Sequence, residues 1–247
     1  MNSCAKCTTT GTENFLLRNV EPELADHIPG DDPRARRFRR DLNRLNAFAM
    51  TDRAMARALL KHTGEVVPRE LIDLGAGDGT LMLRVAQRLA PRWRGVTVKL
   101  VDQQDIVSDP VRNSFAALHW NLQTNTADVF EFLQRLESSV DIITANNFLH
   151  HFTAEHLARL LGLAARRTKL FVACEPRRTH FAREASRFVW LLGCGDVIRR
   201  DVVTSIRAGF VGMEISASWP MRANWMIEER ETGPFLHIFA ANHQNRL

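Results

Sequence analysis

The amino-acid sequence predicts an α/β fold with a mainly parallel, doubly wound sheet and helices on both of its faces. Two observations lead to this prediction. From Leu71 onward, short apolar segments typical of strands alternate with longer segments whose apolar residues recur at helical spacing. The first strand and helix are joined by a turn with three alternating glycines, Gly75, Gly77 and Gly79. Alternation of this kind requires crossover connections, which produce parallel strands covered by helices.

Composition limits the class of protein. The chain has 247 residues, 45% of them hydrophobic, which is enough to bury the core of one domain with additions. The formal net charge is +5, and arginines between residues 34 and 44 carry much of it. We interpret these arginines as the solvated face of a helix rather than a patch for nucleic acid or an anionic membrane, because a base-stacking platform needs several aromatic residues among them.

Four cysteines are too few for a disulfide scaffold in a chain of this size, so we expect a reducing, cytoplasmic location. Cys4 and Cys7 have the C-x-x-C spacing of a metal or redox site, but no second ligand pair lies near them, and we expect an unstructured start instead. The longest apolar stretch, residues 188–194, is too short to span a bilayer, and we expect no membrane insertion.

Two helices are predicted before the first strand. Asp32 and Pro33 are typical of an N-cap and a first helical position, and Thr51 can cap the second helix. The apolar positions are Phe38, Leu42, Leu45 and Ala49 in the first helix and Met55, Leu59 and Leu60 in the second. Because this pair precedes the alternating segments, we expect residues 1–66 to form a polar tail and a helical lid over the strand ends, and residues 67–247 to form the main domain.

Polar residues stand at the ends of successive predicted strands. The strands are expected near residues 71–74, 96–101, 122–127 and 140–145. Asp73 lies in the first strand, Asp102 and Asp128 end the second and third, and Asn146 follows the fourth. Since ligands of open α/β sheets bind outside the carboxyl ends of the strands, these residues are expected to meet at one site.

Two features complete the fold prediction. An insertion near residues 178–210 follows the fifth strand, and its apolar residues fall on one helix face until the glycines at 193 and 195 break it. These residues are Phe181, Ala185, Phe188 and Leu192. We favour core packing over a substrate wall for them. Residues 225–231 and 235–241, joined at Thr232-Gly233-Pro234, are expected to form a hairpin.

A clear resemblance to class I S-adenosylmethionine-dependent methyltransferases rests on the run from Leu71 to Thr80, on the acids at later strand ends and on the run from Asn146 to Phe152. Leu149-His150-His151 is similar to the ubiquinone and menaquinone biosynthesis group. The runs 171–178 and 205–210 resemble methyltransferases associated with bacterial polyketide or phenolic-lipid synthesis. The resemblance implies a Rossmann-like seven-stranded sheet with an antiparallel final strand, and S-adenosylmethionine as cofactor.

The resemblance also implies roles for individual residues. Asp73 is expected to orient the methionine amino group, Gly75 and Gly77 to line the methionine tail, Asp102 to hold the ribose and Asp128 to accept from the adenine amino group. The cofactor set is completed by Ala76, Gln103, Val129 and Asn146.

Methyl transfer is an in-line displacement, so the enzyme must chiefly align the acceptor and keep water away, and a base is needed only if the acceptor carries a proton. His150 and His151 are candidate bases because they follow the fourth strand and histidine accepts protons near neutral pH. One of this adjacent pair is expected to point away. Glu175, at the end of the fifth strand, is the third candidate, although a structural carboxylate beside Arg177 and Arg178 is favoured for it.

We predict a methyltransferase for a small, largely apolar acceptor, with O-methylation of a phenol or enol favoured and C-methylation of an aromatic ring as the alternative. A nucleic-acid methyltransferase is less favoured, because residues 146–149 lack the D/N-P-P-Y/F motif and Cys174 lacks a preceding proline. A cofactor-binding scaffold without turnover and a homodimer stay open, whereas the missing G-x-G-x-x-G disfavours an NAD-dependent oxidoreductase. No metal is expected, because no carboxylate and histidine cluster has ligand spacing in the sequence.

Overall fold

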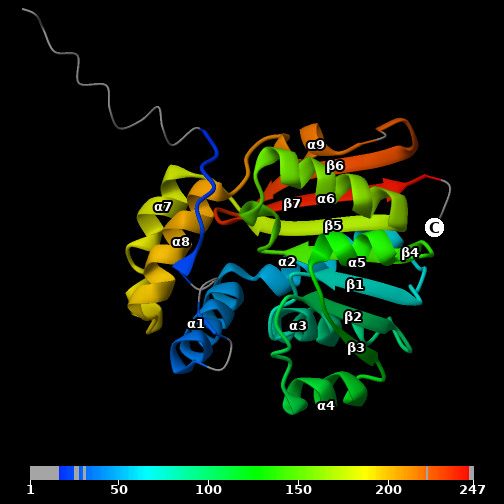
Figure 1. The fold of residues 1–247 in the computed structure, drawn as a ribbon, viewed down its shortest axis with the longest axis horizontal. Helices are drawn as coiled ribbons and strands as arrows, with labels where there is room; N and C mark the ends of the chain where they lie inside the picture. Colours follow the sequence, from blue (N-terminus) through cyan, green and yellow to red (C-terminus); the bar gives the residue numbers. More distant parts are fainter. Residues whose placement is uncertain (1–16, 25–27, 30–31, 221, 245–247) are drawn as a thin grey trace, which may run out of the picture.

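The computed structural model describes residues 17–24, 28–29, 32–220 and 222–244. Cys4 and Cys7 lie outside these described residues. Seven strands in the described part of the chain form one sheet, in the order β3-β2-β1-β4-β5-β7-β6 (Figure 1). They are β1 (Glu70–Leu74), β2 (Thr97–Asp102), β3 (Asn121–Thr126), β4 (Val140–Asn146), β5 (Thr168–Pro176), β6 (Trp225–Thr232) and β7 (Leu236–His243).

Strand directions confirm the predicted sheet. β1 to β5 pair in parallel, whereas β7 is antiparallel to both β5 and β6. The hairpin between β6 and β7 lies where the sequence predicted it. The sheet is therefore a doubly wound, Rossmann-like sheet that ends in an antiparallel hairpin.

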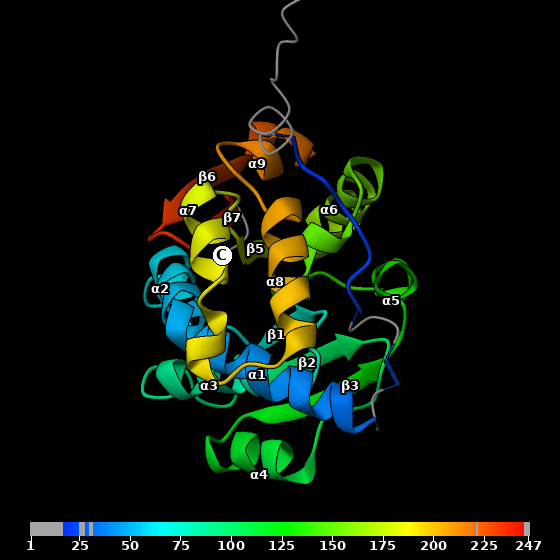
Figure 2. The same cartoon turned by 90° about the vertical axis from the view of Figure 1, so that its left-hand side faces the viewer.

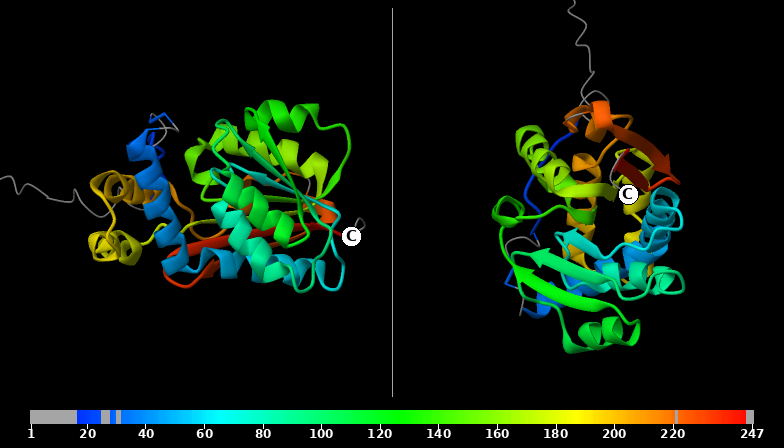
Figure 3. Two further views of the ribbon diagram at one scale, coloured as in Figure 1. Left: turned by 90° about the horizontal axis from the view of Figure 1, so that it is seen from below. Right: turned by 90° about the vertical axis from the view of Figure 1, so that its right-hand side faces the viewer.

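Helices cover both faces of the sheet (Figure 3). One apolar core joins the sheet to α2 (Thr51–Thr63), α3 (Thr80–Leu89) and α4 (Asp109–Ala117), and a second joins it to α5 (Val129–Arg135), α6 (Ala154–Arg167) and α9 (Glu214–Ser218). These two cores give the chain its layered α/β architecture.

The lid prediction is wrong for α2. Met55 and Leu59 of this helix are fully buried in the same core as β1 and β5, beside α3. The predicted cap is also wrong: Met50, in the left-handed conformation with φ 57°, takes the N-cap position, and Thr51 is the first helical residue. A stripe of apolar residues looks the same in sequence whether it faces a sheet or a cavity.

The lid prediction fits α1 (Pro33–Ala49), which lies at the carboxyl end of the parallel strands beside the insertion (Figure 2). Its start is as predicted, since the Asp32 side chain accepts a hydrogen bond of 2.7 Å from the backbone N–H of Arg34, and Pro33 follows. The domain boundary near residue 66 stays a prediction.

The insertion consists of α7 (His180–Ser186), the 3-10 turn η4 (Val189–Leu192) and α8 (Asp196–Ala208). It is attached to α1 through Asp41, whose fully buried carboxylate accepts from the backbone N–H of Gly195 at 2.9 Å. Arg44 donates to the carbonyl of Gly193 at 3.3 Å. The glycines that break the helical pattern thus form the joint with α1.

Residues 17–24 run along α8 (Figure 1). The Arg18 Nε donates to the carbonyl of Ala208 at 2.7 Å, and the backbone N–H of Leu24 donates to Asp201 at 3.0 Å. A segment predicted as polar tail is therefore brought to the strand ends. Within the described residues, none of the helices is both long and apolar enough to cross a membrane.

Candidate active site

The glycine turn after β1 has the predicted backbone. Gly75, Gly77 and Gly79 have φ values of 66°, 55° and 75°, in the left-handed region that favours glycine. A Cβ on Gly75 would lie 2.1 Å from Cδ2 of Phe148, whereas a Cβ on Gly77 would meet no atom within 4 Å. At Gly75 the protein's own phenyl ring therefore occupies the space that a Cβ would need.

Asp102 joins the end of β2 to this turn. Its carboxylate accepts from the backbone N–H of Gly77 at 2.8 Å and from that of Gln104 at 3.0 Å, and it lines the cavity described below. Gln103 was the predicted neighbour, but the side chain that lines the cavity is Gln104. The ribose contact of Asp102 stays a prediction.

Asp73 lies behind the cavity rather than in its wall. Its side chain accepts from Thr144 Oγ1 at 2.7 Å and from Asn146 Nδ2 at 3.2 Å, and burial raises the pKa of its carboxyl to about 7. Asn146 does line the cavity, and its Oδ1 is buried without a hydrogen-bond partner. This orphaned acceptor suits an ammonium group, so the residues fit the methionine end of S-adenosylmethionine, with Asp73 orienting Asn146.

Asp128 and Val129 begin α5. The Asp128 carboxylate accepts from the backbone N–H groups of Phe130 at 2.8 Å and Glu131 at 3.2 Å, so it is the N-cap of this helix. Neither Asp128 nor Val129 is among the residues that line the cavity. The adenine contact proposed for them stays a prediction.

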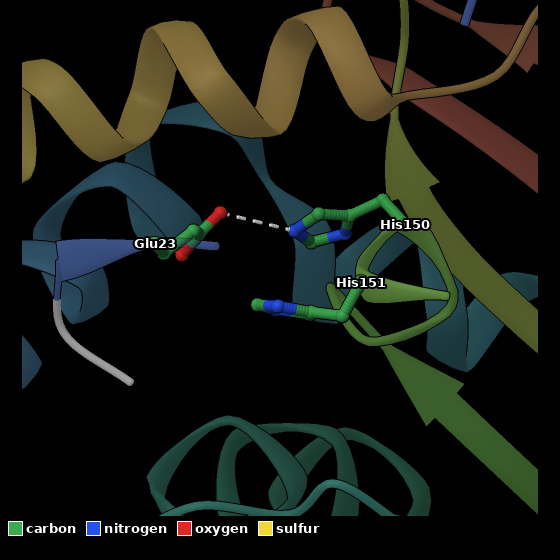
Figure 4. A group of neighbouring side chains, drawn as sticks. All are labelled: Glu23, His150 and His151. Atoms are coloured by element: carbon green, nitrogen blue, oxygen red, sulfur yellow. Dashed lines mark hydrogen bonds and ion pairs between the residues drawn. The ribbon is translucent and has the colours of Figure 1, made fainter. Parts of the chain in front are cut away.

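The histidine pair lies at the start of the connection after β4, in the turn η3 (Leu149–His151). The His150 ring is buried between two carboxylates: its Nδ1 is 2.8 Å from Glu175 Oε2, and its Nε2 is 3.3 Å from Glu23 Oε1 (Figure 4). The ring of His151 lies against that of His150, with centroids 4.3 Å apart. Both histidines line the cavity, so the expectation that one points away is wrong.

Glu175 holds the turn that carries His150. Its fully buried carboxylate accepts from the backbone N–H groups of Phe148 at 3.0 Å and Leu149 at 2.9 Å, in addition to the His150 ring. Its predicted role as a base is corrected, because it lies outside the cavity wall and acts by positioning His150. The predicted neighbours are also corrected, since Arg177 pairs with Glu231 and Arg178 with Glu214.

The two carboxylates keep His150 protonated. Burial alone would lower the pKa of the imidazole, but the hydrogen bonds and charges of Glu175 and Glu23 outweigh it and raise the pKa to about 9. Burial would raise the pKa of Glu23, but the hydrogen bond and charge of His150 outweigh this effect and lower it. At neutral pH the resting site therefore holds an imidazolium between two carboxylates.

The same cluster contradicts the reason for expecting no metal. Ligand atoms of Glu23, His150 and His151 lie within 4.8 Å of one another, so folding brings together a carboxylate and two histidines that could hold a metal ion. A metal ion at Nε2 of His150 would have to displace the proton that Glu23 now accepts. We therefore interpret the cluster as a site that handles a proton.

A cavity of about 620 Å³ joins these features. One side is formed by Gly75, Ala76, Gly77, Asp102 and Asn146. The other side is apolar and comes from α1 and the insertion, with Phe38, Leu42, Leu45, Phe181, Ala185, Phe188 and Leu192 among its residues. Core packing, the interpretation favoured for the insertion, holds in part for Leu192, which packs against a small buried cluster of Val189, Cys194 and Ile198. It is wrong for Phe181 and Phe188, which line this cavity and stay more than half exposed.

Comparison with known proteins bears on the side of the cavity that is formed by the glycine turn and the strand ends, which we call the donor side. Residues 71–170 match the sequence profile of a family described as "Methyltransferase domain". This segment is therefore similar to a methyltransferase domain. The protein is an S-adenosylmethionine-dependent methyltransferase, and Gly75, Gly77 and Asn146, which lie in the matched segment, fit this cofactor. A search of curated protein sequences found no match.

Solved structures with the same fold include an O-methyltransferase family protein from Burkholderia thailandensis (16% identity, TM-score 0.55, 80% of this chain and 57% of that one). They also include the plantazolicin methyltransferase BpumL in complex with SAH (13%, 0.59, 86% and 91%) and the pyocyanin biosynthetic protein PhzM (16%, 0.50, 77% and 55%). The chain thus spans little more than half the length of the first and third of these proteins. At these identities the likeness shows the fold alone.

Sequence reasoning missed three residues that complete the histidine site. Glu23 is the second carboxylate on His150, and Ser205 of α8 donates a hydrogen bond to it. Arg18 donates to the carbonyls of Leu149 and His150 at 3.2 and 3.1 Å. Arg18 and Glu23 belong to a segment without hydrophobic periodicity, so no pattern in the sequence indicated that they reach the strand ends.

Proposed function

We propose that this methyltransferase transfers a methyl group to the oxygen of a small, largely apolar phenol or enol. The observation that carries the proposal is the pair His150 and His151 on the wall of an apolar chamber that is continuous with the cofactor turn. The fold neighbour named as an O-methyltransferase family protein supports it. The plantazolicin methyltransferase and the pyocyanin biosynthetic protein among the neighbours support an acceptor from a biosynthetic reaction.

Different residues of the chain serve the cofactor and the acceptor. S-adenosylmethionine, when bound, supplies an electrophilic methyl group on a sulfonium. Gly75, Gly77, Asp102 and Asn146 would hold it at the strand ends, while α1 and the insertion would enclose the acceptor and exclude water. Specificity for an apolar acceptor follows from the apolar side chains of this wall.

Proton removal falls to His150. Its Nε2 accepts the hydroxyl proton of the acceptor once this nitrogen is deprotonated and its contact with Glu23 is released. Glu175 keeps the ring in place through Nδ1, and Arg18 fixes the backbone of the same turn. His151 lies beside the ring and faces the same cavity, where it can bind the acceptor oxygen.

The nucleic-acid alternative loses support in its cytosine C5 form. Cytosine C5 methylation needs a cysteine nucleophile, but Cys174 is fully buried in β5 and burial raises the pKa of its thiol. Cys174 and Cys194 are both free thiols, which supports our proposal of a reducing, cytoplasmic location.

The test is turnover with a panel of alkylated phenols, enols and single-stranded oligonucleotides, followed through S-adenosylhomocysteine and the mass of the product. We expect methylation of one or more phenols or enols, with the methyl carbon on oxygen by NMR. A C-methylated ring would replace the proposal with the C-methyl alternative. Methylation of the oligonucleotides alone would overturn it.

A further inference from the structure

We propose that the face formed by α7, η4 and the adjoining part of α1 docks on an anionic lipid surface. Docking would place the cavity mouth against the bilayer, from which a lipid-dissolved acceptor can enter. The docking surface is inferred from its own residues, whereas the nature of the acceptor rests on the proposed function.

The first observation is a patch of large apolar side chains on the insertion. Phe181, Phe188, Trp190 and Leu191 are 62%, 60%, 55% and 64% exposed. A single exposed apolar residue is ordinary, but four within residues 181–191 form a patch that needs an explanation. Phe181, Phe188 and Leu191 also line the cavity, so the cavity reaches the surface between them.

Trp190 belongs to the same exposed turn as Leu191. It is exposed and is not among the residues that line the cavity. The other tryptophans are buried, with exposed fractions of 1% for Trp93, 3% for Trp120 and Trp219, and 6% for Trp225. Tryptophan is enriched where a protein meets the headgroup region of a membrane, because its ring is apolar and its N–H is polar.

The second observation is the charge beside the patch. The α1 segment contains six arginines and one aspartate, and Arg37, Arg40 and Arg44 expose 61%, 62% and 46% of their side chains. Asp41 lies within 4.0 Å of all three, but one carboxylate offsets one positive charge. The contacts of Asp41 with Gly195 and of Arg44 with Gly193 fix this basic helix next to the apolar turn.

A lipid surface matches both observations at once. Anionic headgroups attract arginines, and the acyl region accepts Trp190 and Leu191. An acidic protein would match the arginines but leave the apolar side chains against charged groups. In Figure 2, α7, α8 and α1 all face the viewer, so the basic and apolar elements share one face. The sequence-based interpretation of the arginines as a solvated helix face is replaced here, because the sequence did not place an apolar turn beside them.

The experiment uses the full chain with vesicles of phosphatidylcholine alone or mixed with phosphatidylglycerol. We expect co-sedimentation with the mixed vesicles, a blue shift of tryptophan emission, and loss of binding as salt rises. Because the other tryptophans are buried, the shift reports on Trp190. The variant Trp190→Phe should still co-sediment with the mixed vesicles but should lose the blue shift of tryptophan emission.

Variants separate the apolar contribution to vesicle binding from the electrostatic one. Trp190→Ser and the double variant Arg37→Gln/Arg40→Gln should each weaken vesicle binding, the latter roughly tenfold or more. The matched controls are Met226→Ser, exposed on β6, and Arg135→Gln, exposed on α5, and both should bind as the parent does. Thermal unfolding checks that each variant is folded.

Three results would overturn the proposal: no binding to either vesicle, equal binding to both at all salt concentrations, or unchanged binding of Trp190→Ser and of the arginine variant. Methyl transfer to a water-soluble phenol should be unchanged in Trp190→Ser. Failure of docking with that activity intact would reject the surface alone, whereas vesicle binding without any methyl transfer would reject the proposed function alone.

Discussion

The donor side and the acceptor side of the cavity are built in different ways. The donor side uses backbone and side chains at the tips of adjacent parallel strands, with Gly75, Gly77, Asp102 and Asn146 as its main groups. The acceptor side is assembled from parts far apart in the chain, including Glu23, Ile28, α1, the insertion and the β6–β7 turn. The cofactor site is therefore specified by local conformation, whereas the acceptor site depends on how distant elements pack.

The largest expected effect tests the donor side. Gly75→Ala combines a left-handed residue with a Cβ placed 2.1 Å from the Phe148 ring. We expect a loss of about 2–4 kcal/mol in the free energy of unfolding, measured by chemical denaturation. Gly77→Ala is the matched control, because it has the same backbone strain but open space at the Cβ, and about 1–2 kcal/mol is expected. Equal losses in both would show that Phe148 does not constrain the turn.

The second prediction concerns the base on the acceptor side. His150→Ala should lower turnover by about 100-fold or more and leave S-adenosylhomocysteine affinity unchanged, because the ring belongs to the acceptor half. Turnover is measured by single-turnover kinetics and affinity by calorimetry. His156→Ala, in α6 outside the cavity, is the control. Full activity of the His150 variant would move proton removal to His151 or to solvent.

The third prediction returns to the donor side. Asp102→Ala should weaken cofactor binding by about 1–3 kcal/mol through lost ribose hydrogen bonds and a loosened Gly77 turn. Calorimetry with S-adenosylhomocysteine measures it. Asp105→Ala, at an exposed carboxylate of the same loop, should bind normally. Similar affinities for both variants would remove Asp102 from the cofactor site.

The smallest expected effect is a shift in the pH dependence of kcat/KM. The base form of His150 is the deprotonated one, so kcat/KM should rise with pH through about 9, where the imidazolium titrates. Glu23→Gln removes one carboxylate that raises this pKa, so the rising limb should move to lower pH. The rate at pH 7, relative to the plateau, should increase roughly 3- to 10-fold. A limb that stays in place would show that Glu23 does not set the pKa of His150.

The sequence was sufficient for the parts whose conformation is local. A strand that turns sharply into a helix needs positive φ, so the glycines predicted the β1–α3 turn. Asp102 was likewise predicted at the end of the next strand. The sequence was insufficient where packing decides. The apolar stripe of α2 did not reveal that it faces the sheet, and nothing near Glu23 indicated that this residue reaches His150.

The contact between Phe148 and Gly75 has a consequence for the reaction as a whole. The phenyl ring precedes the histidine turn and rests on the glycine turn, so one side chain spaces the two halves of the chemistry. The size of this ring therefore helps to set the separation of the glycine turn from the histidine turn. Because Phe148 is not among the residues that line the cavity, a smaller residue at position 148 would change that separation without removing a group from the cavity wall.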